Sequence, residues 1–566
     1  MAAEAAGTLV VLGVALWYWL LYFRRGTNLL DEGSQAAQAL RVLNGEVIYK
    51  DFFTVVTPFS YYTVAWLFDL FGAELMVMRW TVLALGMGMA ALTMLVARRV
   101  MAWPFAAAAA LMTTVWGWFT VAPNFYSWEA SFLVLVALGC YLRHVQTAAP
   151  WWIAAAGAAA GLTAMTKQNV GAYVTAALLL CIWLSAAFDR TLDVKRRLRL
   201  TAWLATGVAL PALSTLVMLV AAGAGPYLYE SWVYYPLVKY PPRFSVPYPA
   251  FYPLLPDLQL ATIGDVTGAW GRLPEAARYE VIARIVIYIP LVTYPVGAAL
   301  VGILAGRYRR SRDADLARHG HLVLAIALVG FLTLFQAWPR ADVTHILFGL
   351  QPTFILFAYL WWQPFQALAR LPGPRSLVQA IALTVTLAPQ LALVWYGYAR
   401  TDWEYQNYVA ALQVDRGQGV LAHPSEAERI NKMTSFILHN TAADDPIFVV
   451  PWASGFYFLT GRHNPTRSDF ILFEDPEAYP CILSRLEQNP PKYVIYGYTW
   501  DVDGRHFRDY ARPLDEYIRT RYVLEDSVDG YEAWRRIESA GPRTGDWDRA
   551  CQPRRFRFQD LSGAVQ

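Results

Sequence analysis

Two adjacent carboxylates, Asp31 and Glu32, stand in the polar stretch NLLDEGSQAAQALRVLNG, directly after the first apolar segment of the chain. Apolar residues recur at helical spacing between 36 and 43, and the Asn-Gly pair at 44–45 is typical of a helix end. The two acids therefore stand at the start of a predicted helix. One interpretation is that they stabilise its N-terminus, by about 0.3–1 kcal/mol. The other is that Asp31 is a general base that takes a proton from an attacking hydroxyl or amine.

The remainder of the chain is strongly apolar. Of its 566 residues, 56% are hydrophobic and only 16% are charged, whereas a soluble chain carries about 25% charged residues. The 23 Trp and 33 Tyr fit belts of aromatic residues at membrane interfaces. This composition predicts a polytopic α-helical membrane protein, and the net charge of +4 is too small to indicate a nucleic-acid partner. The first apolar segment has no small-residue cleavage site and is predicted to remain as an anchor.

A helix needs roughly 20 apolar residues to cross the hydrocarbon core of a membrane. By this criterion we predict eleven transmembrane helices, at 7–23, 76–97, 102–120, 127–143, 151–166, 170–187, 201–222, 282–304, 322–338, 345–362 and 377–397. A shorter apolar run near 60–72 is interrupted by Asp69 and is predicted to lie along the membrane surface.

Basic residues indicate the orientation of the chain. With a cytoplasmic N-terminus, most of them fall in the inner loops, which contain Arg98, Arg99, Arg143, the runs at 189–200 and 307–319, Arg370 and Arg375. The outer loops contain only scattered basic residues, including Lys167, Lys239, Arg243 and Arg340, and Arg24 and Arg25 lie on the wrong side. Three longer segments are then extracytoplasmic: the first outer loop (24–75), a Tyr- and Pro-rich loop (223–281) that we interpret as a lid, and the tail. We divide the chain into a membrane domain (1–399) and a tail domain (400–566) in a plasma-membrane protein of the cell envelope.

The tail alternates helical and strand patterns. EAERINKMTSFILHN has helical spacing, PIFVV and KYVIYG are typical of buried strands, and YVLEDSVDGYEAWRR predicts two strands joined by a turn. A small extracytoplasmic α/β domain is therefore predicted. No Gly-rich phosphate loop opens a helix in it, so we assign it no catalysis. Cys481 and Cys551 could form a disulfide in an oxidising compartment or remain two thiols, and the sequence leaves both open.

The first outer loop, with NLLDEG, RVLNGEV, YKDFF and TPFSYY in order, resembles that of polytopic GT-C glycosyltransferases of the family 39 type. That group includes protein O-mannosyltransferases and the transferases that put aminoarabinose on lipid A. GLTAMTKQNVGAY (161–173), FQAWPRADVTHILFGLQP (335–352) and DDPIFVVPWASGFYFLTGRHNPTR (444–467) extend the resemblance over most of the chain. It implies transfer of a sugar from a polyprenyl-phosphate carrier to an acceptor outside the cytoplasm. Asp31 matches the proposed base, with Glu32 beside it to orient the sugar or a basic neighbour.

A lipid-phosphate donor requires cations near the outer interface. Lys167, in TKQN, ends a predicted span on the outer side, and Arg340 and His345 lie in the outer loop WPRADVTH. Arginine binds phosphate bidentately and histidine can donate to it, so we predict a phosphate site from these three residues. The alternatives are a lysine that merely reaches the interface and two ordinary loop residues.

Two further acids are possible site residues. Asp342 lies in the same outer loop as Arg340. Asp51, in YKDFF, could serve as a second polar residue of the site, although we prefer an ion pair with Lys50 or Arg41. Oxygen ligands of this kind suit Mg²⁺ or Mn²⁺, but no second carboxylate cluster stands in an outer loop. No essential metal or other cofactor is therefore expected.

The resulting hypothesis is a single displacement with inversion, in which Asp31 deprotonates the acceptor. A retaining route would need a carboxylate nucleophile, which the sequence does not indicate. A polytopic transporter or lipid flippase is the alternative, although such proteins usually place polar residues near the bilayer midplane. An inactive scaffold that binds the lipid carrier is a third possibility. The sugar, the acceptor (protein, lipid or polysaccharide), the carrier length and the oligomeric state are left open by the sequence.

Overall fold

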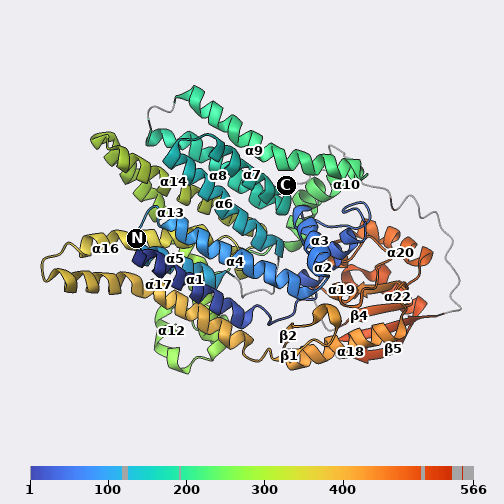
Figure 1. The fold of residues 1–566 in the computed structure, drawn as a ribbon. Helices are drawn as coiled ribbons and strands as arrows, with labels where there is room; N and C mark the ends of the chain where they lie inside the picture. Colours follow the sequence, from blue (N-terminus) through green and yellow to red (C-terminus); the bar gives the residue numbers. More distant parts are fainter. Residues whose placement is uncertain are drawn as a thin grey trace.

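Long apolar helices form a bundle that is joined at one end to a small α/β domain (Figure 1). The computed structural model describes residues 2–117, 125–189, 193–498, 504–528, 530–537 and 551. The bundle helices are α1 (Ala2–Tyr22), α4 (Leu75–Ala97), α5 (Trp103–Trp116), α6 (Phe125–Thr147), α7 (Trp151–Thr166), α8 (Gln168–Leu184), α9 (Val194–Ala221), α13 (Glu275–Ser311), α14 (Ala314–Leu334), α16 (Gln351–Leu368) and α17 (Arg375–Tyr405).

A helix lies at each predicted membrane span, but the count of eleven spans is not confirmed. Within the described part of the chain, eight helices are long and apolar enough to cross a membrane: α1, α4, α6, α8, α9, α13, α14 and α17. Helices α5 and α7 have only 14 and 16 residues, and α16 is not among the eight. Residues 118–120 of the span predicted at 102–120 lie outside the described residues.

The loops between the bundle helices form shorter helices, and all but α12 (Ile263–Ala269) and α15 (Val343–Leu347) lie near the tail (Figure 1). The first loop forms α2 (Asp31–Leu43) and α3 (Phe59–Phe71), which confirms both helices predicted there. Asn44 follows α2, and Gly45 has a φ of +91°, a conformation that glycine adopts without strain. The later loop forms α10 (Gly225–Tyr229), the π-helix η2 (Glu230–Lys239), α11 (Tyr240–Phe244) and α12, and α15 precedes α16.

The tail contains a four-stranded sheet in the order β3-β4-β6-β5. The strands are β3 (Ile447–Val450), β4 (Tyr493–Gly497), β5 (Tyr522–Val528) and β6 (Tyr531–Arg536), with β3 parallel to β4 and the other pairs antiparallel. The tail helices are α18 (Pro424–Asn440), α19 (Gly455–Thr460), α20 (Tyr479–Gln488), α21 (Phe507–Tyr510) and α22 (Arg512–Arg521), and a short pair joins β1 (Ala410–Ala411) to β2 (Leu421–Ala422). The predicted strands and the helix at 426–440 are thereby confirmed.

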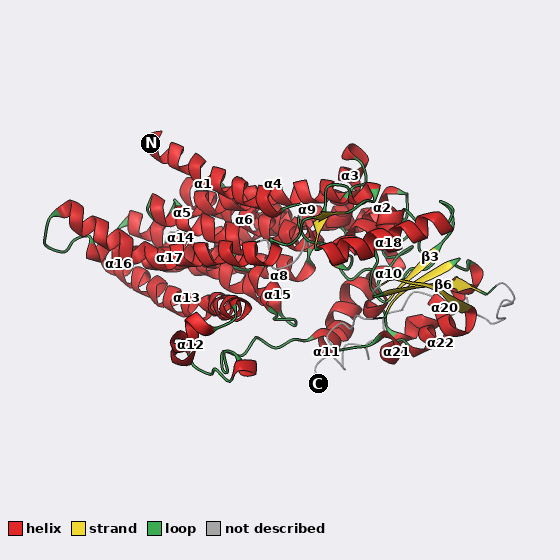
Figure 2. Ribbon diagram, turned by 90° about the horizontal axis from the view of Figure 1, so that it is seen from below, coloured by secondary structure: helices red, strands yellow, loops and turns green. Residues whose placement is uncertain are grey.

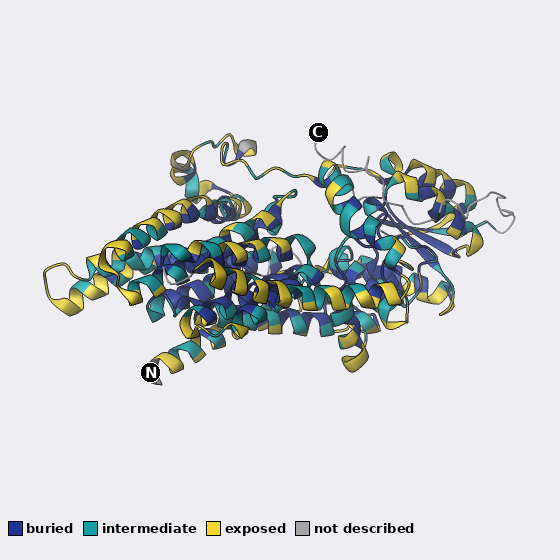
Figure 3. Ribbon diagram, turned by 90° about the horizontal axis from the view of Figure 1, so that it is seen from above, coloured by how far each residue is buried: buried dark blue, intermediate teal, exposed yellow. Residues whose placement is uncertain are grey.

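The two faces of this sheet belong to different cores because successive side chains of a strand point to opposite sides. Phe448 and Val450 pack with residues of α20 and α22, whereas Ile447 and Val449 join the core that continues into the membrane bundle. Helices α20 and α22 lie on one side of the sheet and α18 on the other (Figure 2). Buried residues fill β3, β4 and the interior of the bundle (Figure 3), and one core contains residues of both. The tail is therefore packed onto the bundle through a shared core.

Candidate active site

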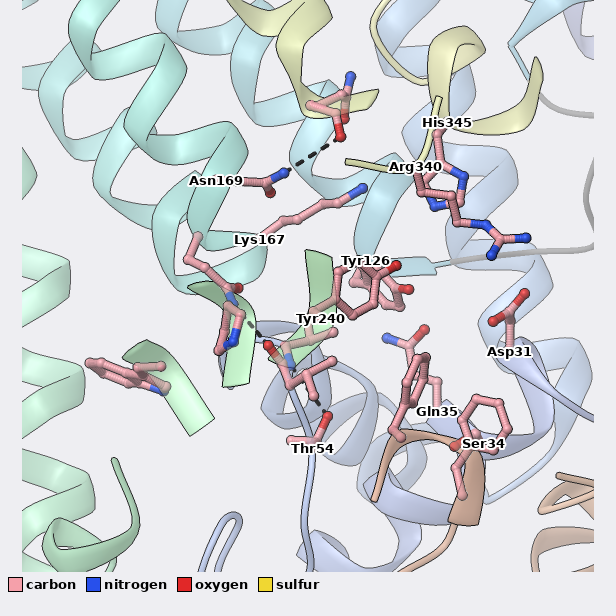
Figure 4. A pocket seen from close by; sticks show the side chains of 18 of the residues that line it. Asp31, Ser34, Gln35, Thr54, Tyr126, Lys167, Asn169, Tyr240, Arg340 and His345 are labelled. Atoms are coloured by element: carbon pink, nitrogen blue, oxygen red, sulfur yellow. Dashed lines mark hydrogen bonds between the residues drawn. The ribbon is translucent and has the colours of Figure 1, made fainter. Parts of the chain in front are cut away.

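A cavity of about 440 Å³ opens where the first loop, the α7–α8 turn, the loop before α15, the η2 region and the tail meet. Asp31, Lys167, Arg340 and His345, which come from three distant parts of the sequence, all line it. Figure 4 shows Asp31, Arg340 and Lys167 directed toward the same space from different elements. The four residues predicted as base and phosphate ligands are thus brought together.

Asp31 is held at the start of α2 by Asn28. The Asn28 Oδ1 atom accepts hydrogen bonds from the backbone N–H groups of Leu30 (3.0 Å) and Asp31 (2.7 Å), while the N-cap residue Leu30 provides no side-chain cap. Its Nδ2 donates to Asp31 Oδ2 at 3.2 Å. Burial raises the pKa of Asp31, while Asn28 and the nearby charges of His345 and Arg340 oppose that rise. A carboxyl with a raised pKa is a stronger base once ionised.

Helix α2 presents a polar face to the cavity. Asp31, Gln35 and Gln38 lie at helical spacing on this face, and Ala36 and Ala39 are buried in the core. The alternation of alanine and polar residues therefore fixes the rotation of the helix that aims Asp31 into the cavity.

Glu32 lies outside the cavity lining, so the structure does not bring it together with Asp31. Its side chain is buried and accepts two hydrogen bonds from Arg79, from Nε at 2.8 Å and from Nη2 at 2.7 Å. Arg79 also donates to the carbonyl oxygen of Gly26 at 2.8 Å. The physical reason is helix geometry, since neighbouring residues point about 100° apart. Glu32 thus contacts a basic neighbour, and this ion pair fixes α2 against α4.

Lys167 is the single residue between α7 and α8, with extended backbone angles (φ −151°, ψ 102°). Its Nζ donates to Ser127 Oγ at 3.1 Å and lies 5.3 Å from the ring centroid of Phe348. Burial lowers the pKa of Lys167 to about 8, against the opposing charge of Asp342. The turn is tight because a Cβ on Gly171 would lie only 2.2 Å from the Cα of Ala164.

Asp342, the N-cap of α15, positions Arg340 of the preceding loop and His345 of α15. Its Oδ2 accepts from Arg340 Nε at 2.8 Å, and its Oδ1 accepts from the backbone N–H of His345 at 3.0 Å and pairs with His345 Nδ1 at 2.7 Å. Although burial acts to raise it, hydrogen bonds from His345 and the charges of His345 and Arg340 lower the pKa of Asp342 to about 2. Asp342 itself is not part of the cavity lining. It is therefore an orienting anion rather than a direct ligand.

Asp51 is also outside the cavity lining, and its contacts differ from the expected ion pair. Its carboxylate accepts a hydrogen bond from the backbone N–H of Val47 at 2.7 Å, and its carbonyl oxygen accepts from Arg41 at 2.9 Å. Arg41 instead pairs with Glu46 and, at 2.8 Å, with Asp469 of the tail. Asp51 therefore closes a turn, and Arg41 joins α2 to the tail.

Sequence reasoning missed the part of the site that the tail supplies. Phe470, Phe473 and Glu474 line the cavity together with Tyr240 of α11. Burial raises the pKa of Glu474 to about 7, and a hydrogen bond from Ser468 opposes that rise. No motif surrounds Glu474, so only the docking of the tail reveals its place.

No group of three or more His, Cys, Asp or Glu side chains that could hold a metal ion occurs among the described residues. The acids of the site stand apart from one another, on α2, in the loop before α15 and in the tail. The cavity combines two carboxyl groups, of Asp31 and Glu474, with the basic side chains of Lys167, Arg340 and His345, and with aromatic rings and amide groups. Such a set can bind an anion and accept a proton in the same enclosure.

A comparison with protein-family models finds no match, and neither does a comparison with curated proteins. Solved structures do match. ArnT from Cupriavidus metallidurans bound to undecaprenyl phosphate aligns with a TM-score of 0.52 at 15% identity, over 96% of this chain and 99% of that one. Its apo form aligns with a TM-score of 0.50 at 16% identity, over 96% of this chain and 100% of that one. The Archaeoglobus fulgidus oligosaccharyltransferase aligns with a TM-score of 0.50 at 12% identity, over 93% of this chain and 73% of that one.

The chain has the GT-C fold. This confirms the fold that the first-loop resemblance implied, a multi-pass helical membrane protein with a C-terminal α/β region. At these identities the likeness concerns the fold. Within this GT-C fold, the loop between α1 and α4 carries Asp31 and packs against the tail, at the end of the bundle opposite the α16–α17 turn (Figure 1).

Proposed function

We propose that this protein is a membrane glycosyltransferase that moves a sugar from a polyprenyl-phosphate donor to an extracytoplasmic acceptor. The observation that carries the proposal is the single cavity in which Asp31 faces Lys167, Arg340 and His345. The GT-C fold supports it, and the similar ArnT structure binds undecaprenyl phosphate. The N-terminus is then cytoplasmic, and the cavity end of the bundle lies outside.

The phosphate of the carrier binds to the basic side chains. Arg340 and His345 are already oriented by Asp342, so little reorganisation is needed when the anion arrives. Lys167 is half-buried, in surroundings where charge interactions are stronger than in water. The same groups stabilise the negative charge that grows on the leaving phosphate as the glycosidic bond breaks.

Asp31 removes the proton from the acceptor. The hydroxyl or amine transfers its proton to the carboxylate while its lone pair forms the new bond to the anomeric carbon. The bond from that carbon to the phosphate oxygen breaks, and its electron pair leaves with polyprenyl phosphate. One displacement of this kind inverts the configuration, and no residue in the scheme is asked to form a covalent intermediate.

The test is donor consumption by purified protein. Undecaprenyl-phosphate hexoses and pentoses are supplied together with lipid and polysaccharide fractions of the source cell envelope, and mass spectrometry follows the release of undecaprenyl phosphate. We expect Asp31→Asn to lower the rate by about 10²–10⁴-fold, the range of general-base catalysis, while binding of the carrier persists.

Asp69→Asn is the matched control, because Asp69 is an exposed carboxylate of the same loop. It is expected to react at the rate of the unmodified protein. Full activity of Asp31→Asn would remove the assignment of the base. Absence of donor consumption by the unmodified protein with every sugar tested would remove the proposal itself, and would favour a transporter.

A further inference from the structure

The cavity contains buried hydrogen-bond acceptors that lack donors. The side chains of Gln35 and Gln336 are 2% and 4% exposed. The Oε1 atom of each has no hydrogen-bond partner among the described residues, and both residues line the cavity. A buried polar atom without a partner costs about 1–3 kcal/mol. A ligand that donates hydrogen bonds at these two points would remove that cost.

The side-chain amide of Gln35 and the backbone of Gln336 are each held by a hydrogen bond. Gln35 Nε2 donates to Ser60 Oγ at 2.7 Å. The backbone carbonyl of Gln336 accepts a hydrogen bond of 3.5 Å from Asn169 Nδ2. Gln35 comes from the helix that carries Asp31, and Gln336 from the loop that carries Arg340. The free oxygens therefore stand near both partners of the proposed reaction.

Glu474 adds an acceptor from the tail. Its side chain is 6% exposed and accepts a hydrogen bond of 2.6 Å from Ser468 Oγ. Its carbonyl oxygen accepts from Arg243 at 2.9 Å, and Lys239 pairs with Asp475 at 2.6 Å. The tail segment is thus clamped to the end of η2 and to α11, which makes it a fixed wall of the cavity.

Aromatic rings complete this wall. Phe473 lies 6.2 Å from Tyr240 and 4.4 Å from Phe470, measured between ring centroids, and all three rings line the cavity. Apolar walls with a few placed polar groups are the usual construction of a small-molecule site. Carboxylate and amide acceptors beside aromatic rings suit a ring with an apolar face and several hydroxyl groups.

We infer that Gln35, Gln336 and Glu474 form an acceptor set that recognises the hydroxyl groups of a sugar ring, with Phe473 and Tyr240 packing against that ring. This inference rests on the proposed function and makes it more specific, since it gives the tail a part in substrate selection. The ring belongs either to the donor or to a sugar acceptor. Both offer the same hydroxyl chemistry, and the experiment below separates them.

Two variants in different elements test the inference: Glu474→Gln, and Gln336→Met, which removes an acceptor at similar size. Glu487→Gln is the control, because Glu487 is a buried tail glutamate paired with Arg521 and Arg536, outside the cavity lining. Three measurements are made on each full-length protein: affinity for undecaprenyl phosphate, affinity for its hexose- and pentose-bearing forms, and KM for the acceptor fraction.

If the ring is that of the donor, both variants bind sugar-bearing carriers about 10- to 100-fold more weakly, as expected for loss of a hydrogen bond to a charged or buried group. Affinity for sugar-free undecaprenyl phosphate then changes less than twofold. If the ring is that of the acceptor, donor affinity is retained and the acceptor KM rises by a similar factor. Glu487→Gln changes none of the three values.

The inference is overturned if both site variants match the unmodified protein in sugar affinity and acceptor KM. It is equally overturned if they lose affinity for the sugar-free carrier to the same extent as for sugar-bearing ones. A protein that binds sugar-bearing carriers through Glu474 but transfers nothing would overturn the proposed function and leave the sugar site standing. The two failures are therefore distinguishable.

Discussion

At the residue scale, the charge of Lys167 sets a testable dependence of carrier binding on pH. The pKa of about 8 lies below the ordinary value of 10.5 because burial disfavours the ammonium. Below pH 8 the Lys167 side chain is charged and attracts phosphate. Above pH 8 it is mostly neutral and must first gain a proton, which weakens binding. We expect affinity for undecaprenyl phosphate to fall between pH 8 and 9.5, by up to about tenfold per unit.

Lys167→Arg is the matched variant, because a guanidinium stays charged throughout this range. Its affinity is expected to stay level between pH 7.5 and 9.5 in the same binding titration. Measurements below pH 7 are avoided because the phosphate itself titrates near about pH 6. Equal slopes for the two proteins would show that Lys167 does not provide the titrating charge.

Single residues also show how far sequence reasoning reached. Residue type, side of the membrane and the resemblance singled out Asp31, Lys167, Arg340 and His345, and these four residues line one cavity, while their roles stay predictions. Glu32 is next to Asp31 in the sequence but not on the helix surface, and its carboxylate pairs with Arg79. No sequence motif surrounds Glu474, because its place in the cavity depends on how the tail packs against the bundle.

At the scale of elements, the α7–α8 hairpin determines where Lys167 stands. Gly171→Ala would place a Cβ 2.2 Å from the Cα of Ala164, so the two helices must separate. Overpacking of this kind typically costs about 1–3 kcal/mol. We expect a lower unfolding temperature in detergent, and weaker binding of undecaprenyl phosphate because Lys167 moves with the turn.

Gly139→Ala in α6 is the control, because a Cβ there meets no atom within 4 Å. Alanine is a better helix former than glycine by about 1 kcal/mol, so this variant is expected to unfold at the same or a higher temperature. A Gly171→Ala protein that matches it in both measurements would mean that the hairpin adjusts without moving Lys167.

Element positions were predictable where hydropathy alone determines them. Each predicted span coincides with a helix because an apolar run in a membrane must satisfy its backbone internally. The status of α5 as a span was less predictable. Neighbouring helices cover it, and Phe105, Ala106, Ala109 and Ala110 are fully buried. For a helix inside the bundle, length and hydropathy do not show whether it contacts lipid.

At the scale of the whole molecule, the tail is part of the cavity and not an appendage. Its sheet shares a core with the bundle, and the Arg41–Asp469 ion pair of 2.8 Å fixes it to α2. The sequence indicated an α/β region but assigned it no part in the site, because contacts between segments more than 400 residues apart leave no local pattern. The shape of the cavity therefore depends on the packing of the tail as well as on the helices.

The Cys481–Cys551 disulfide closes a stretch of 70 residues within that tail. The sequence had left the pairing open, and the structure contains the bond. In the chain-entropy treatment, closing a loop of this length stabilises the folded tail by roughly 4 kcal/mol. We expect Cys551→Ser, or reduction of the unmodified protein, to lower the unfolding temperature of the tail, while donor binding at low temperature is retained because neither cysteine lines the cavity.

Calorimetry with and without reductant measures this effect, with Cys140→Ser as the control, because Cys140 is a free thiol outside the tail. Reductant should lower the unfolding temperature of the unmodified protein and of Cys140→Ser, and leave that of Cys551→Ser unchanged.

The same bond tests the orientation of the chain. In intact cells an extracytoplasmic tail should resist alkylation at Cys481 until it is reduced, since disulfides persist in oxidising compartments. If Cys481 is freely alkylated and reductant does not change the thermal unfolding transition, both the disulfide and the proposed orientation are contradicted.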